Sequence, residues 1–238
     1  MSRLLRLLAL LALAAISLQL YFVARVALMI GVDPASTTFQ RSEARRILGQ
    51  QGRLAWSQDW VPLSAVSPHL PRAIIASEDA GFAEHGGIEW EAVQGAWDKN
   101  QKAEQRVQQR GSRRPPKVVG GSTLTQQLAK NLFLSGERTF LRKAQEALLT
   151  LALEGLLSKR RLLELYVNHV EWGEGVFGAE AAARHYFRVP ARQLSAAQAA
   201  RLAVMLPAPK RFERQPNSPY LAGRSATIQA RMGAVQVP

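Results

Sequence analysis

The hydrophobic and polar positions divide the chain into an apolar N-terminal run, a mixed connector and a long helical region. Residues 7–24 form an uncharged, mostly apolar run that, as a helix, crosses most of a hydrocarbon layer of roughly 30 Å. Residues 33–71 mix polar side chains, prolines and aromatics, which is typical of a connector at a domain edge. From Arg72 onward, apolar residues recur at helical spacing, which predicts one all-α or mainly α domain.

The first short helix of this region carries a pair of carboxylates. It is expected to start near Pro71, to bury Ile74 and Ile75, and to deliver Glu78 and Asp79 at its exposed end. A carboxylate beside apolar side chains can have its pKa raised toward the range that a general base needs. The same pair also fits a structural or merely solvated role, so the pattern leaves both interpretations open.

A second helix is expected to follow two glycines in residues 120–131 (GGSTLTQQLAKN). Ser122 can cap it, and the leucines at 124, 128 and 132 form its apolar stripe. The polar face would carry Thr123, Gln126, Gln127 and Lys130 beside a helix N-terminus whose free N–H groups attract anions. This arrangement predicts a diphosphate or sugar site, although a glycine-serine helix start can also be a cap without function.

A third helix follows Arg138 and combines an apolar face with charged residues one turn apart. Arg142 and Glu146 have the i, i+4 spacing of an ion pair, which by itself is ordinary on a helix surface. Transfer of a sugar from a diphosphate needs a base for the acceptor hydroxyl and positive charge for the departing phosphates. Glu78 with Lys130 and Arg138 fits those needs. The expected core face consists of Ala144, Ala147, Leu148 and Leu151.

The first 30 residues are expected to be a retained single-pass anchor. Arg3 and Arg6 precede the apolar run, so the N-terminus should stay in the cytoplasm and the rest should be exported, although Arg25 weakens this bias. A cleaved signal peptide is the alternative, because residues 12–14 (ALA) loosely resemble a cleavage site. The apolar stretch continues to Ile30, which favours an anchor.

Net charge narrows the classes of partner. The chain has a formal charge of +13, which favours nucleic acid, acidic lipid headgroups or a phosphorylated substrate, and the apolar span argues against nucleic acid. Residues 98–117 carry seven basic and two acidic side chains, which predicts either a solvated surface loop or a basic flap over phosphates. The absence of cysteine excludes disulfides and thiolate metal sites.

Four segments in this order resemble the signature of the peptidoglycan glycosyltransferase family: EDAGFAEHGG, GGSTLTQQLAKN, RKAQE and KRRLLELYVN. The resemblance runs from about Val61 to near the C-terminus. It implies a lysozyme-like α-helical fold that polymerises lipid II into β-1,4-linked glycan strands and releases undecaprenyl diphosphate. Ser-x-x-Lys and Lys-Thr-Gly, the marks of an attached transpeptidase, do not occur, so the chain resembles the monofunctional members without transpeptidase activity.

Carried over by position, Glu78 resembles the base that activates the 4-hydroxyl of the acceptor, and Glu146 resembles a second carboxylate that helps to hold the donor diphosphate. Val167 stands where the family's Tyr-Leu-Asn motif has Leu, and Glu89 stands where Asp is usual. The predicted substrate-binding residues are Ser122, Thr123, Gln126, Gln127, Lys130, Asn131, Arg138, Arg142 and Lys143, with Asp79, Phe82 and His85 as structural support.

These inferences give an anchor in residues 1–30, a connector in 31–60 and a transglycosylase domain in 61–238, outside the bacterial inner membrane. Expected partners are lipid II, the growing strand, membrane lipids and other cell-wall synthesis or division proteins. No ligand-spaced protein cage for a metal is evident, so Mg²⁺ or Mn²⁺ would bridge the substrate diphosphate. A glycan-cleaving enzyme of lysozyme-like fold and a membrane-tethered scaffold are the rival interpretations.

Overall fold

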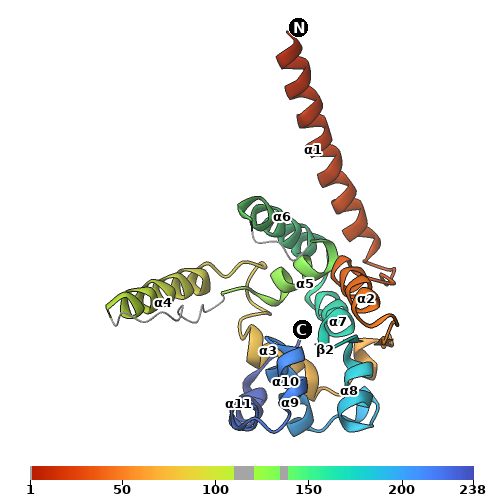
Figure 1. Cartoon of the computed structure of the whole chain (residues 1–238), viewed down its shortest axis with the longest axis vertical. Helices are drawn as coiled ribbons and strands as arrows, with labels where there is room; N and C mark the ends of the chain where they lie inside the picture. The colour runs from red at the N-terminus through yellow and green to blue at the C-terminus, as the bar shows by residue number, and fades with distance from the viewer. Residues whose placement is uncertain (1, 110–120, 135–138) are drawn as a thin grey trace.

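The computed structural model describes residues 2–109, 121–134 and 139–238, and these residues form a mainly α-helical body from which the long helices at residues 3–28 and 90–109 project (Figure 1). The α-helices are α1 (Arg3–Leu28), α2 (Thr38–Gln51), α3 (His69–Glu78), α4 (Trp90–Gln109), α5 (Leu124–Phe133), α6 (Phe140–Leu156), α7 (Lys159–His169), α8 (Ala179–Phe187), α9 (Ala196–Met205), α10 (Pro209–Arg214) and α11 (Pro219–Arg231). Short 3₁₀ turns are η1 (Leu63–Ala65), η2 (Ala191–Gln193) and η3 (Met232–Ala234).

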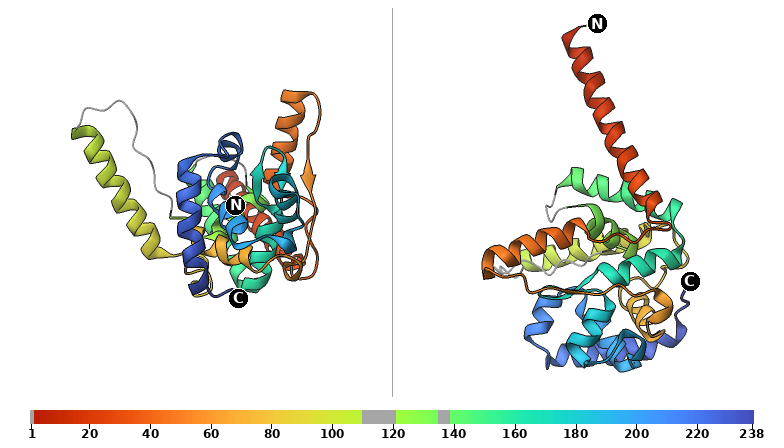
Figure 2. Two further views of the ribbon diagram at one scale, coloured as in Figure 1. Left: turned by 90° about the horizontal axis from the view of Figure 1, so that it is seen from below. Right: turned by 90° about the vertical axis from the view of Figure 1, so that its right-hand side faces the viewer.

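Helix α1 has the length and apolar composition of a membrane span, as predicted, and its last turns pack against the body. Val26 and Met29 are buried there, and the ring of Phe22 meets that of Phe133 edge-on with centroids 5.5 Å apart. Figure 2 shows α6 beside the part of α1 that joins the body. The C-terminal end of α1 is therefore part of the core of the domain.

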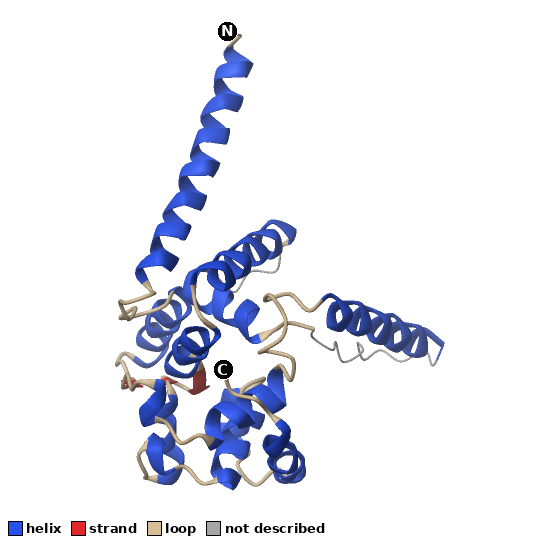
Figure 3. Ribbon diagram, turned by 180° about the vertical axis from the view of Figure 1, so that it is seen from behind, coloured by secondary structure: helices blue, strands red, loops and turns tan. Residues whose placement is uncertain are grey.

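The connector contains a helix that the mixed composition of residues 33–71 did not predict. Thr37 and Gln40 form a reciprocal capping box at the start of α2, and Gly52 ends the helix at a φ of 65°. The helix buries Ile47. The following strand β1 (Ser57–Gln58) pairs in parallel with β3 (Val176–Phe177), which pairs antiparallel with β2 (Glu171–Gly173) (Figure 3). This small sheet joins the connector to the C-terminal half.

Helix α3 packs with α9 and α11 in the lower part of the body, below α5 and α6 in Figure 1. Leu70, Ile74 and Ile75 are buried in this lobe, as the apolar spacing predicted for Ile74 and Ile75. Apolar side chains three or four apart fall on one face of a helix, which places that face on the core. The helix ends at Glu78, so this carboxylate lies where the lobe meets the loop that follows.

Helix α4 extends away from the body. The loop expected in residues 98–117 is therefore wrong for the residues of this segment that the structure describes. Residues 98–109 continue α4 instead of forming a loop, while residues 110–117 lie outside the described part of the chain. Long polar side chains such as Lys, Gln and Glu have high helix propensity, so a sequence with few apolar residues can still be helical. The basic composition indicated exposure correctly but not backbone conformation.

The core face predicted for α6 was wrong. Leu148 and Leu151 are 52% and 54% exposed, and Ala144 is also exposed. The buried side of the helix carries Glu146 and Leu149, followed by Thr150 and Leu153. The helix therefore turns its more apolar side outward, next to the base of α1, and directs a carboxylate inward.

Candidate active site

Glu78 is partly buried at the end of α3, and two side chains hold its carboxylate. Ser77 donates to Oε1 at 3.2 Å, and Gln127 from α5 donates from Nε2 to Oε2 at 3.2 Å. Burial raises the pKa of Glu78, against the lowering effects of the bonds from Gln127 and Ser77 and of the charge of Arg224. This is the environment expected of a carboxylate that accepts a proton.

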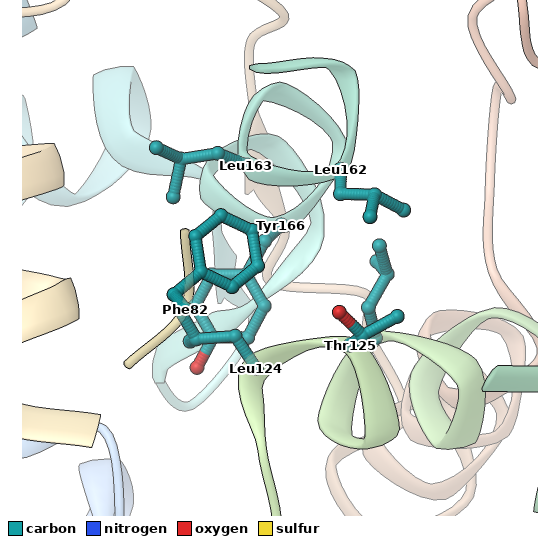
Figure 4. A pocket seen from close by; sticks show the side chains of 7 residues that line it. Phe82, Leu124, Thr125, Leu162, Leu163 and Tyr166 are labelled. Carbon is teal, nitrogen blue, oxygen red and sulfur yellow. The ribbon is translucent and has the colours of Figure 1, made fainter. Parts of the chain in front are cut away.

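Behind Gln127, the phenol of Tyr166 on α7 donates to the amide oxygen of Gln127 at 2.9 Å. The ring is 1% exposed and lies in an apolar pocket between α5 and α7, together with Phe82 from the loop after α3 (Figure 4). Burial raises the pKa of Tyr166 well above its usual value, and the nearby charge of Glu78 raises it further. The phenol therefore keeps its proton.

Asp79 is buried, not at an exposed helix end as predicted. Its Oδ1 lies 2.8 Å from Nε2 of His85, and its Oδ2 accepts a bond from the backbone N–H of Leu124 at 2.9 Å. The N–H of Gly87 donates to Nδ1 of His85 at 3.0 Å, so the neutral ring carries its proton on Nε2 and donates to Asp79. Asp79 thus joins the loop after α3 to the start of α5.

The start of α5 differs from the predicted anion cradle. The cap is Thr123, which forms a reciprocal capping box with Gln126, while Ser122 is exposed and does not cap the helix. The hydroxyl of Thr123 also donates to the carbonyl of Gly87 at 2.6 Å. Because Asp79 accepts the N–H of Leu124, this helix start already binds a carboxylate of the same chain.

Lys159 and Glu154, which the sequence analysis did not single out, hold the loop that follows α3. The ammonium of Lys159 donates to the carbonyl of His85 at 2.6 Å, pairs with Glu154 at 2.8 Å and lies 4.7 Å from the centre of the Phe82 ring. Glu154 also accepts a bond from the hydroxyl of Thr125 at 2.5 Å. The position of Lys159 at the start of the KRRLLELYVN segment was the available signal.

A second carboxylate site lies on the inward side of α6. Glu146 is 3% exposed, and Arg142 donates to its Oε2 at 2.9 Å while Lys143 pairs with its Oε1. The predicted Arg142–Glu146 pair is therefore present, with Lys143 as a second cation. The side chain of Lys143 remains half exposed, so its ammonium can also meet a ligand.

Lys143 lines an open depression of about 190 Å³ where α4, α5 and α6 meet. Helix α4 contributes Trp97 and Asn100, which the sequence analysis did not identify. The remaining lining residues are Ala96, Gly121, Ser122 and Gln126. Of the other predicted binding residues, Lys130 is exposed, Asn131 is buried, and Arg138 lies outside the described residues.

One group of possible metal ligands lies beside Glu78. Donor atoms of Asp79, His85 and Glu89 lie within 4.8 Å of one another. Nε2 of His85 already carries the proton that it donates to Asp79, because Nδ1 accepts from Gly87. A cation bound at Nε2 would move that proton to Nδ1 and set it against the N–H of Gly87. The group therefore fits a hydrogen-bonded support better than a cation site.

Comparison with known proteins gives a consistent result. The Transglycosylase family matches residues 45–233. A protein of Burkholderia thailandensis named biosynthetic peptidoglycan transglycosylase is 51% identical over 92% of this chain and 82% of its own length. Proteins with the same name from Paraburkholderia xenovorans and Bordetella pertussis are 48% and 47% identical, over 97% and 94% of this chain and 91% and 90% of their own lengths. By this match and these identities, the chain belongs to the Transglycosylase family.

Proposed function

We propose that Glu78 is the general base of a peptidoglycan glycosyltransferase that polymerises lipid II. The Transglycosylase family and the names of the relatives support glycan-strand polymerisation in cell wall synthesis as the activity of this chain. The observation that carries the role of Glu78 is a partly buried carboxylate with a raised pKa, oriented by donors from two different segments of the chain.

In the proposed step, Glu78 takes the proton of the 4-hydroxyl of an acceptor lipid II. The freed oxygen attacks the anomeric carbon at the lipid-linked end of the growing strand, and the new C–O bond is β-1,4. The bond from that carbon to the diphosphate oxygen breaks, and undecaprenyl diphosphate leaves with the electron pair. Proton removal by a positioned base contributes about 10²–10⁴-fold to such reactions.

The departing diphosphate needs positive charge, and the depression beside α6 supplies it. Glu146 fixes Arg142 and Lys143 at one end of this helix, and Lys143 lines the depression together with Ser122. Fixed cations at the site where charge develops stabilise a transition state without the reorganisation that water would need. In this proposal Glu146 orients the two cations, and Trp97 and Asn100 form the outer wall for the donor.

In the same proposal, any divalent cation is bound by the diphosphate of the substrate and not by a dedicated protein site. Both carboxylate oxygens of Glu146 are paired with side chains of α6, and His85 is protonated on the nitrogen that faces Asp79. Mg²⁺ keeps several waters and is often bound through substrate phosphates and only one or two carboxylates. Mg²⁺ or Mn²⁺ would therefore bridge the substrate diphosphate and neutralise its charge.

The proposed location is the outer face of a bacterial inner membrane, with α1 as the single-pass anchor. Gln19 lies nine residues before the end of α1 and exchanges two hydrogen bonds with Gln145 of α6, at 2.8 and 3.0 Å. Nine residues of helix span about 14 Å, so the contact brings α6 to the depth of the anchor. The outward apolar side of α6, with Leu148 and Leu151, would then face lipid.

The decisive experiment uses the full-length protein in detergent with purified lipid II. Polymeric glycan should form, and Glu78→Gln should abolish it while leaving the thermal unfolding temperature near that of the parent. Asp59→Asn, a change at an exposed carboxylate of the connector, is the control and should polymerise normally. Glu78→Gln that still polymerises at the parental rate would refute the base assignment.

Two further assays, degradation of mature wall glycan and activity in cells, separate the two rivals. A glycan-cleaving enzyme would degrade mature wall glycan without making polymer, and it would not depend on Arg142 or Lys143. A scaffold would keep its cellular activity after Glu146→Gln or Lys130→Ala and lose it when the charges of residues 98–117 are reversed. If the chain is the proposed enzyme, Glu146→Gln should cause a larger loss of activity than the charge reversal.

A further inference from the structure

A hydrogen-bond chain reaches Glu78 from two helices that are distant in sequence. Tyr166 of α7 donates to Oε1 of Gln127 in α5, and Nε2 of Gln127 donates to Oε2 of Glu78 at the end of α3. The two distances are 2.9 and 3.2 Å. Each donor–acceptor pair in the chain is within the range of a hydrogen bond.

Tyr166 determines the donor-to-acceptor direction of this chain of hydrogen bonds. An amide can point either its oxygen or its NH₂ group at a neighbour, and only the NH₂ group is compatible with an ionised carboxylate. The phenol has one proton, and the Tyr166 side chain is 1% exposed and lines an apolar pocket with Phe82 and Leu162, so water does not compete for that proton. By donating that proton to Oε1 of Gln127, it leaves Nε2 as the group that faces Glu78.

We infer that Tyr166 is a positioning residue for the reaction: it sets the amide of Gln127 so that Gln127 is a donor to Glu78 and stabilises its ionised, proton-accepting form. This inference rests on the proposed role of Glu78 as the base. Tyr166, the first residue of the Tyr-Val-Asn segment, thus acts on Glu78 through Gln127 and not by a hydrogen bond of its own.

Other groups near Glu78 do not replace this effect. Asp79 is the neighbouring carboxylate and disfavours the ionised form, while Arg224 of α11 favours it by its charge. Ser77 donates to the other oxygen, Oε1. Among these groups, Gln127 is the donor to Oε2, so the direction of its amide decides how readily that oxygen holds a negative charge.

The test is the pH dependence of polymerisation by the full-length protein. Tyr166→Phe keeps the ring and removes the proton that orients Gln127, so the amide can turn its oxygen toward Glu78. The base then ionises less readily, and the acid limb of the rate profile should move up by about one pH unit, the size of a lost hydrogen bond to a charged form. The rate at high pH should fall less than the rate at low pH.

Tyr186→Phe is the matched control, because the Tyr186 hydroxyl donates to the backbone carbonyl of Trp172 at 2.7 Å, away from Glu78. It should leave the acid limb in place. Gln127→Met removes the middle of the chain without changing Tyr166, so it should shift the acid limb by itself. In the Gln127→Met background, Tyr166→Phe should add no further shift, since its effect passes through Gln127.

Each alternative outcome has a defined meaning. An equal loss of rate at every pH in Tyr166→Phe, or a further shift in the Gln127→Met background, would overturn the positioning role and leave Tyr166 a packing residue. Glu78→Gln with undiminished polymerisation would instead overturn the proposed base, whatever Tyr166→Phe does. The two failures are therefore distinguishable in one series of variants.

Discussion

Asp79→Asn should destabilise the domain far more than its small change in shape suggests. The two oxygens of Asp79 accept from two different donors, Nε2–H of His85 and the N–H of Leu124. Asparagine offers one acceptor oxygen and one NH₂ group, so one of these donors must face another donor. The ring of His85 cannot correct this by moving its proton to Nδ1, because Nδ1 accepts from Gly87.

The magnitude follows from the two bonds. Losing a hydrogen bond to a charged group costs about 1.5–3 kcal/mol, and leaving a buried donor unpaired costs about 1–3 kcal/mol. Asp79→Asn should therefore lower the free energy of unfolding by about 4 kcal/mol. For a domain of this size that corresponds to a fall of roughly 10 °C in the unfolding temperature. The loop after α3 also loses its link to α5, so polymerisation should fall with stability.

Thermal unfolding of the full-length protein in detergent, followed by tryptophan fluorescence, measures this effect. Asp98→Asn, which changes an exposed carboxylate on α4, should leave the unfolding temperature unchanged. In combination with His85→Phe, which removes one of the two donors, Asp79→Asn should cost less than it does alone. An Asp79→Asn protein that unfolds within about 1 kcal/mol of the parent would refute the argument from donors and acceptors.

Three further predictions concern other parts of the fold. Gly87 has a φ of 88°, and an added Cβ would lie 2.6 Å from Cγ of Glu154, so Gly87→Ala should lower the unfolding free energy by about 2–3 kcal/mol in a denaturant titration. Burial lowers the pKa of His169 to about 4, so stability should be lost as pH falls from 6.5 toward 4, by up to about 3 kcal/mol, and His169→Phe should remove that slope in unfolding measured against pH. Gln19→Leu or Gln145→Leu alone leaves one amide unpaired and should lower the unfolding temperature, whereas the double change should restore it.

Local periodicity was sufficient for the elements whose packing follows from one stretch of sequence. The N-terminal apolar helix lies where the continuous apolar run placed it, and the buried Ile74 and Ile75 of α3 and the leucine stripe of α5 lie where the spacing of apolar residues placed them. Helical spacing determines which side chains share a face, and that information is contained within a few turns. The nearness of Arg142 to Glu146 was predictable for the same reason.

The contacts that orient the carboxylates were not predictable in this way, because they join residues far apart in the chain. Tyr166 is 39 residues from Gln127, and Asp79 is 45 residues from Leu124. The wrong cap at α5 is a different case. Ser122 and Thr123 are adjacent hydroxyl residues, but only Thr123 stands three residues before a glutamine, Gln126, and can form the reciprocal capping box. That signal was present in the sequence.

The wrong core face predicted for α6 shows that helical periodicity alone does not tell whether an apolar face packs against the protein core or faces lipid. Assigning the apolar face to the core assumes that water surrounds the rest of the helix, yet α6 packs beside the base of an apolar span. If lipid covers the outer side, Leu148 and Leu151 gain little by moving inward, since hydrocarbon is as apolar as a protein core. The polar side is then free to face the interior, where Glu146 meets Arg142 and Lys143. If α6 lies beside lipid, the same inversion that made the prediction wrong explains how this helix can carry a charged cluster on its inner side.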